Sequence, residues 1–449
     1  MVRVRTSSSR TPSSWTLPLK RRGSLPRAGA LAAAVACVTA CEPDLSSPGS
    51  GQFRIEAALI SSQPIQSVIQ GGILGLECKV FDPGGLPVGG VDPAVTASRI
   101  GPAATCSTFR VAHSGLDTLR ISANGALATL PVAVAIPPQV SSPQGQVLAV
   151  DSVPSGAIPW VVSVRRNSSG KIELFVAMLV DPSGSPFEDL HRYVSDDNGN
   201  TFRYDGVVLS HDTVGCALTG FGIENVAVVP RAEAPGWRLY FSGGQFDCYG
   251  WQVFSAVSTD ERTWVIEPGI RLSNTADGQP AEEGPIPWPV GEGMVVDRTA
   301  GGAWRMLVGG YEHILPNENK FQIVEWTSPD QLNWTYEDTA FTTRQMPHEG
   351  QASIYSPTIR GFAPGLWRMI FAGDNRDDPN GRGRVWSAVS TDMRSWQLEG
   401  MLIHSDQSDY YYSSLVDDFL VFIRDDSGLP PFQGDPHLHR LAGARVTMP

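Results

Sequence analysis

The chain has 449 residues, of which 18% are charged and 41% are hydrophobic, and it contains 46 glycines and 35 prolines. This length predicts two domains and a leader, and the turn-rich composition predicts an all-β globular protein. The formal net charge of −12 argues against nucleic acid and other polyanions as partners, because like charges repel.

The first forty residues predict an export signal. They carry seven positive charges and no acidic residue, and they end in the apolar run AGALAAAVACVTA at residues 28–40. A positive segment, a short apolar segment and small residues before a cleavage site are typical of a secretory signal peptide. Removal of this leader would lower the formal net charge from −12 to −19.

The end of the leader, Val38-Thr39-Ala40-Cys41, resembles the bacterial lipobox. The resemblance implies that Cys41 is lipidated and becomes the mature N-terminus, followed by a polar Pro/Gly/Ser tether at residues 41–51. The expected location is the bacterial cell envelope, on its periplasmic or cell-surface face, with the bilayer as a partner through the lipid. The alternative is a plain secreted protein, and in either case we expect a monomer.

Four cysteines remain after Cys37 and Cys41 are assigned to the leader and the lipid. In an exported protein, four thiols predict two disulfides, and the spacing favours Cys78–Cys106 and Cys216–Cys248. The sequence has no CxxC pair and no Cys/His cluster with zinc spacing, so we predict no structural metal site.

Residues 52–137 predict a small β-sandwich. Segments such as FRIEAAL, GLECKVFD and LATLPVAVAI alternate apolar and polar residues, and turn residues separate them about every ten positions. The pattern around GLDTLRISANG resembles a bacterial immunoglobulin-like domain, with Cys78–Cys106 as its disulfide.

The rest of the chain repeats itself. The decapeptide SAVSTDERTW at residues 255–264 returns as SAVSTDMRSW at residues 387–396. Related turns make four copies, whose first serines are Ser195, Ser258, Ser328 and Ser390. Strand-like segments such as WRLYF, WRMLV and WRMIF precede the later copies. A period near 60 residues built of strands predicts propeller blades of four strands each.

The count of repeats predicts five blades in residues 140–449. Four copies are explicit, and a fifth unit from Tyr410 onward keeps three strands but lacks the Ser-x-Asp turn. We expect residues 144–150 to supply its missing strand and close the ring. The turns themselves have a structural interpretation, because Ser and Asp two residues apart bond to their own backbone. The tryptophan after each turn is expected to insert between neighbouring blades.

An array of blades with Ser-x-Asp-x-x-x-Trp turns resembles the arabinanase, levansucrase and invertase superfamily of five-bladed propellers. The turn SDDNGNTF at residues 195–202 also resembles the Asp-box of six-bladed sialidases. In the glycosidase branch, an Asp of blade one is base or nucleophile, an Asp of blade two assists, and a Glu of blade three is the acid. Counting back from the repeated tryptophans identifies Glu292 as the acid, places Glu224 one position from the second site, and puts Ile158 at the first.

The loops on the same face predict a ligand-binding rim. Their Asp, Asn, Arg, His and Tyr side chains suit sugar hydroxyls and pyranose faces: Asp247, Tyr249, Glu312, His313, His348, Glu349, Asp374, Asn375, Arg376, Asp377 and Asp425. No cofactor is predicted; calcium in the loop at residues 373–381 stays an alternative, since its spacing is not that of an EF-hand.

Three functions are consistent with the sequence. The first is a glycoside hydrolase acting on a neutral glycan, with Glu292 as general acid and Glu224 or another acid assisting. The second is a non-catalytic propeller that binds glycan or protein after loss of the blade-one acid. The third, a sialidase-like enzyme, ranks last because Arg360 and Arg376 do not make a three-arginine cluster.

Overall fold

The protein was analysed as a computed structural model, which describes residues 52–180, 187–211, 222–244, 252–272, 288–299, 301–315, 318–347, 353–374, 383–428 and 438–449. The leader, its Cys41 and the cysteines Cys216 and Cys248 lie outside these ranges. Strands make up the regular structure of the described residues, apart from one 3-10 turn, η1 (Thr343–Gln345). The prediction of an all-β fold is confirmed. The same ranges contain no helix long and apolar enough to cross a membrane.

The N-terminal part is built from two small sheets around one core. One sheet pairs β1 (Arg54–Leu59) with β3 (Leu76–Phe81); the other has the order β2 (Gln66–Ser67), β7 (Ala126–Ala135), β6 (Gly115–Ala123), β4 (Ala94–Thr96) and β5 (Ala104–Thr105). Alternate residues of β6 are buried, which is the burial pattern that its sequence predicts. The Cys78–Cys106 disulfide is present, and both cysteines pack at the core.

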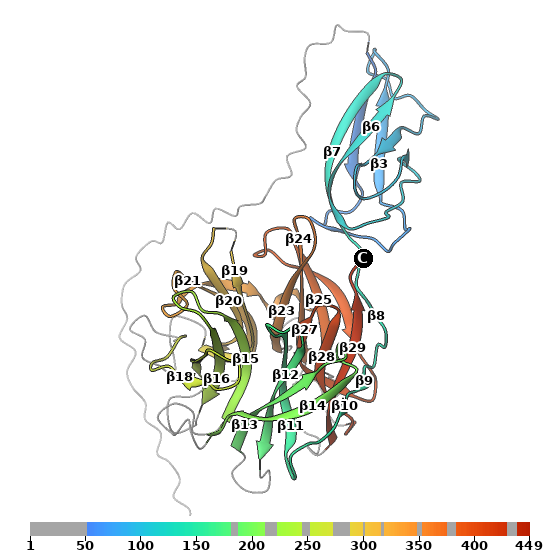
Figure 1. The fold of residues 1–449 in the computed structure, drawn as a ribbon. Coiled ribbons are helices and arrows are strands. Elements are labelled where there is room, and N and C mark those ends of the chain that lie inside the picture. Colours follow the sequence, from blue (N-terminus) through green and yellow to red (C-terminus); the bar gives the residue numbers. More distant parts are fainter. Residues whose placement is uncertain are drawn as a thin grey trace, which may run out of the picture. The chain divides into compact units, whose positions relative to one another are not determined.

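Five four-stranded antiparallel blades follow in chain order (Figure 1). Blade one is β11 (Ile158–Arg166), β12 (Ile172–Val180), β13 (Phe187–Ser195) and β14 (Thr201–Leu209). Blade two is β15 (Gly222–Pro230), β16 (Trp237–Gly244), β17 (Gln252–Ser258) and β18 (Val265–Ile266). Blade three is β19 (Trp288–Arg298), β20 (Trp304–Leu315), β21 (Glu318–Ser328) and β22 (Thr335–Phe341).

Blade four is β23 (Ser353–Ala363), β24 (Leu366–Asp374), β25 (Arg384–Ser390) and β26 (Gln397–Ile403). Blade five takes β27 (Asp409–Val416), β28 (Phe419–Asp425) and β29 (His439–Thr447) from the C-terminal end of the chain. The first strand of each blade contacts the first strand of the next, and β27 contacts β11. These contacts close a ring of five blades.

Residues before blade one complete the ring, as predicted. Strand β9 (Gln146–Val147) pairs antiparallel with β29 at Ala442 and Gly443, so it is the outer strand of blade five. Strand β8 (Gln139–Val140) pairs with the end of β29, and β10 (Ala149–Val150) pairs in parallel with β14 of blade one. The segment therefore joins the last blade to the first.

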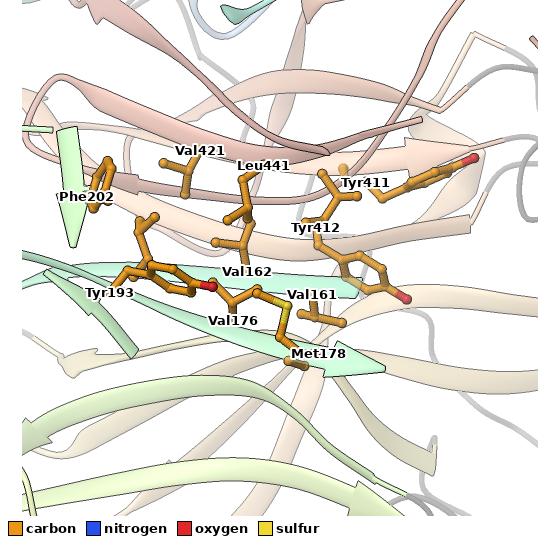
Figure 2. Close-up of a cluster of buried hydrophobic side chains, with 14 of the residues drawn as sticks. Val161, Val162, Val176, Met178, Tyr193, Phe202, Tyr411, Tyr412, Val421 and Leu441 are labelled. Atoms are coloured by element: carbon orange, nitrogen blue, oxygen red, sulfur yellow. The ribbon is translucent and has the colours of Figure 1, made fainter. Parts of the chain in front are cut away.

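Apolar side chains fill the spaces between blades. Between blades one and five, side chains of β11, β12, β13 and β14 face those of β27, β28 and β29 (Figure 2). The tryptophans of the repeated turns pack as predicted: Trp264 lies with blade-one residues, Trp396 with blade-three residues, and the Trp334 ring meets Tyr240 of blade two edge-on. Burial of these faces provides the main stabilisation of the ring.

Each Ser-x-Asp turn makes the internal hydrogen bonds expected of it. In blade two, the Ser258 hydroxyl donates to Asp260 Oδ1 at 2.9 Å, and the same oxygen accepts the backbone N–H of Thr263 at 2.7 Å. The same Ser-to-Asp bond recurs in the turns that begin at Ser195, Ser328 and Ser390. The repeated decapeptide is therefore a corner that the blades share.

Candidate functional site

The inner strands share one irregularity near their starts. Pairing with the second strand shifts between Pro159 and Val161, Glu224 and Val226, Pro289 and Met294, Tyr355 and Thr358, and Tyr411 and Ser414. Bulges of this kind bend a strand and redirect side chains, and they are over-represented next to active sites. Three of the residues at these breaks have left-handed backbone: Asn225 (φ 40°), Ser356 (φ 54°) and Tyr412 (φ 51°).

The pairing register corrects one sequence alignment. Counting back from the tryptophans predicts that Asn225 and Tyr355 occupy equivalent positions. In the structure, Glu224 pairs with Ser242 and Tyr355 with Ala372, each five residues after its tryptophan, so Glu224 is the residue level with Tyr355. The count fails because the β23–β24 hairpin is one residue shorter than the β15–β16 hairpin.

The two predicted acids lie at comparable levels of their blades. Glu292 belongs to the irregular segment of β19 between Pro289 and Met294, and only the backbone is described there. Glu224 is 5% exposed, and Asn225 Nδ2 lies 3.4 Å from its Oε2. Charged side chains are rarely this buried unless they are paired or functional.

A further carboxylate, from Glu188 on the third strand of blade one, reaches the start of β15. Glu188 pairs with Gly222 and is 2% exposed. A Cβ atom placed on Gly222 would lie 2.2 Å from Glu188 Oε2, so this carboxylate occupies the space of the missing side chain. Pairing is regular from Gly222 to Glu224, so both point to one face, about 6–7 Å apart along the strand.

Blades four, five and one contribute an aromatic and polar cluster. The Tyr355 hydroxyl donates to Asp374 Oδ2 at 2.9 Å, and its ring lies 5.3 Å from that of Tyr412. The His439 ring stacks at 5.3 Å on the indole of Trp160, which is only partly buried. His439 Nε2 also lies 3.8 Å from Asp425 Oδ2.

The predicted rim residues divide into three groups. Asp374 and Asp425 are buried members of this cluster, 2% and 0% exposed. Glu312 and His313 lie on β20, where only the backbone is described. Outside the described residues are Asp247, Tyr249, His348, Glu349, Asn375, Arg376 and Asp377.

Sequence reasoning missed Glu188, Tyr355, Tyr412 and His439 as site residues. The run Tyr410-Tyr411-Tyr412 at the start of an inner strand was a usable signal for Tyr412. No sequence signal points to Glu188, since its position depends on contact between two blades. Asp151 is not at the site: its Oδ1 accepts the N–H of Tyr204 at 2.8 Å, on the outer edge of blade one.

Chemically, the arrangement combines buried carboxylates with aromatic faces and hydroxyls. Such a combination can bind a polyhydroxylated ligand, because carboxylates accept hydroxyl hydrogen bonds and aromatic rings pack on apolar ring faces. Among the described residues, no group of three or more His, Cys, Asp or Glu side chains is placed to hold a metal ion.

Comparison with solved structures supports the propeller assignment. A structure described as "Glycoside hydrolase" matches with a TM-score of 0.52 and 14% identity, over 69% of this chain and 93% of that one. Another, of a thermostable family-43 glycoside hydrolase, matches with a TM-score of 0.49 and 10% identity, over 67% of this chain and 96% of that one. No protein-family model matches the sequence. No curated protein matches it either.

Proposed function

We propose that the protein is a carbohydrate-active propeller that cleaves a neutral glycan in its central funnel. The observation that carries this proposal is the buried Glu224 at the register break of an inner strand, with the Glu188 carboxylate on the same face. Glycoside hydrolysis requires two carboxyl groups, one to protonate the leaving oxygen and one to activate water or attack the anomeric carbon.

In this proposal Glu292 is the general acid and Glu224 assists it. A general acid needs a raised pKa, which burial or a neighbouring carboxylate can provide. The aromatic cluster would supply a surface for a sugar ring, with Trp160 partly exposed for that contact. Asp374 and Asp425 would hold Tyr355 and His439 in place.

A hydrolysis assay tests the proposal. Wild type would be incubated with neutral polysaccharides, including arabinan, galactan and xylan, and new reducing ends measured. We expect Glu292→Gln and Glu224→Gln to lower kcat at least about 100-fold, since general acid–base groups contribute about 10² to 10⁴ in rate. The control is Glu56→Gln, which changes an exposed acid of the N-terminal sandwich. Equal activity in all four proteins would contradict the assignment.

The second candidate is a propeller that binds glycan without cleaving it. It is favoured by blade one, where Ile158, Pro159 and Trp160 stand in place of an acid at the start of the inner strand. Binding without release of reducing ends, in wild type as in Glu292→Gln, would establish this alternative.

We also propose that the mature protein is exported and lipid-anchored through Cys41. The support is the sequence of residues 1–41, and the predicted immunoglobulin-like sandwich would separate the anchor from the propeller. Mass spectrometry of the mature N-terminus tests this directly. A lipidated Cys41 is expected in the membrane fraction, and an unmodified Cys41 in a soluble product would contradict it.

A further inference from the structure

The repeated turns contain a residue that points away from their own blade. Directly after the turn Asp, the backbone is left-handed at Asn198 (φ 60°), Glu261 (φ 59°), Gln331 (φ 70°) and Met393 (φ 61°). This conformation is strained for most side chains, and strained positions persist only where surrounding structure holds them. Here the neighbouring blade holds them.

In each case an arginine of the preceding blade binds the left-handed residue. Arg238 Nη1 donates to Gln331 Oε1 at 2.9 Å, and the backbone oxygen of Gln331 accepts the Tyr240 hydroxyl at 2.7 Å. The contacts therefore link blade one to two, two to three, three to four and five to one: Arg165 to Glu261, Arg238 to Gln331, Arg305 to Met393, and Arg445 to the backbone oxygen of Asn198.

Only the link from blade four to blade five lacks a turn, since residues 409–449 contain no Ser-x-Asp corner. The arginine is nevertheless present: Arg368 follows the repeated tryptophan as Arg238 and Arg305 do, and it is fully buried. It binds Glu399 at 2.6 and 2.8 Å and donates from Nη2 to the backbone oxygen of Ile136 at 2.8 Å.

Ile136 is the residue that ends the N-terminal sandwich. Three residues later, β8 pairs Gln139 with Thr447 at the end of β29, which is where the other blades place their turn after the third strand. Ser114 of the sandwich fastens the position, since its hydroxyl accepts the N–H of Ile136 at 2.9 Å and donates to the Pro449 oxygen at 2.6 Å.

Apolar contacts extend this junction along blade four. Ile65, Ala133 and Ala135 of the sandwich form one buried cluster with Leu366 and Val389 of the blade. Gln397 also pairs with the backbone of Ile65, accepting its N–H at 3.2 Å and donating to its oxygen at 2.9 Å. A Cβ atom on Gly365 would lie 2.5 Å from Leu116, so the two surfaces are closely packed.

We propose that the N-terminal sandwich is the fifth corner of the propeller. It occupies the site of the missing turn, satisfies the buried Arg368, and so joins blade four to blade five. The sandwich is then part of the ring and not a free spacer. The junction lies at the end of the blades away from the register breaks of the inner strands, so it leaves the funnel entrance open.

Hydrogen exchange of the full chain tests the proposal. Ile65→Ala and Leu116→Ala change only the sandwich, and they should speed amide exchange about tenfold or more in β24, β26 and β27, with blades two and three unchanged. Ser114→Ala, a milder change, guards against a failure to fold and should act in the same strands. The control is Leu127→Ala, which changes an exposed side chain of the sandwich (67% exposed).

The result that overturns the proposal is faster exchange confined to the sandwich. Blades four and five would then keep the exchange rates of wild type although the junction was weakened. Faster exchange spread equally over all five blades would also overturn it, because the effect would then be global and not local to one junction.

Discussion

At the scale of single residues, the turn aspartates show how local chemistry fixes a corner. Asp330 accepts backbone N–H bonds from Leu332 and Asn333 and a side-chain bond from Asn333. Burial raises the pKa of Asp330, but these donors outweigh it and hold the pKa at about 2. Such bonds form between neighbours in sequence, which is why the sequence alone was enough to predict them.

We expect Asp330→Asn to lower the free energy of unfolding near pH 7 by about 1 kcal/mol, after allowance for partial exposure of the carboxylate. The folded pKa lies below the unfolded value of about 3.9, so the stabilisation is complete above about pH 4 and disappears as pH falls through about 2. Urea unfolding at several pH values measures it.

The control for this series is Asp406→Asn, which changes an exposed aspartate. A difference between wild type and Asp330→Asn that stays constant from pH 7 to pH 2 would show that the charge of Asp330 does not stabilise the turn.

The position of the candidate acids shows the limit of residue-level reasoning. Glu224 was correctly selected as an acid on an apolar inner strand, but its level in the blade was displaced by one position. That level depends on the length of a hairpin further along the chain, and a count of residues assumes equal hairpins. Glu188 was missed because it reaches the site across two blades.

At the scale of the element, the corner residue after each Asp couples one blade to the next. Gln331 is fully buried and makes four bonds: to Arg238 and Tyr240, from its amide to the Pro230 oxygen, and from the Ala232 N–H. The sequence predicted the turn but not this role, because Glu, Gln, Met and Asn at that position share no chemistry. They share only a left-handed backbone.

Gln331→Asn keeps a residue that tolerates left-handed backbone but shortens the side chain, so it should leave Arg238 without one of its acceptors. We expect a loss of about 2 kcal/mol in the free energy of unfolding. Urea unfolding followed by tryptophan fluorescence measures it. Gln407→Asn, on the surface, should change the value by less than about 0.5 kcal/mol. Equal effects of the two substitutions would refute the coupling role.

At the scale of the whole molecule, the number of blades and the closure by residues 144–150 were predictable from the repeat period and from one incomplete unit. The junction between sandwich and blade four was not predictable. It depends on a backbone oxygen, at Ile136, which carries no sequence signal. The immunoglobulin-like identity of the sandwich remains a prediction.

Closure of the ring depends on a close approach at Gly145, where the backbone has φ 67° and a Cβ atom would lie 2.3 Å from the Phe422 ring. Gly145→Ala should therefore lower the free energy of unfolding by about 1–3 kcal/mol more than Gly156→Ala. Gly156 has a similar φ of 77° but nothing within 4 Å of its Cβ position, so it controls for backbone strain. Equal losses would mean that contact with Phe422 does not hold the closing segment.

The central claim is that the funnel entrance binds carbohydrate. Hydrogen exchange of wild type, with and without neutral oligosaccharides prepared from the polysaccharide panel, tests it most directly. We expect slower exchange at the starts of the inner strands, above all β15 and β27, with the sandwich and the Ser-x-Asp turns unchanged. Protection confined to the sandwich or the turns, or no protection by any oligosaccharide of the panel, would contradict it.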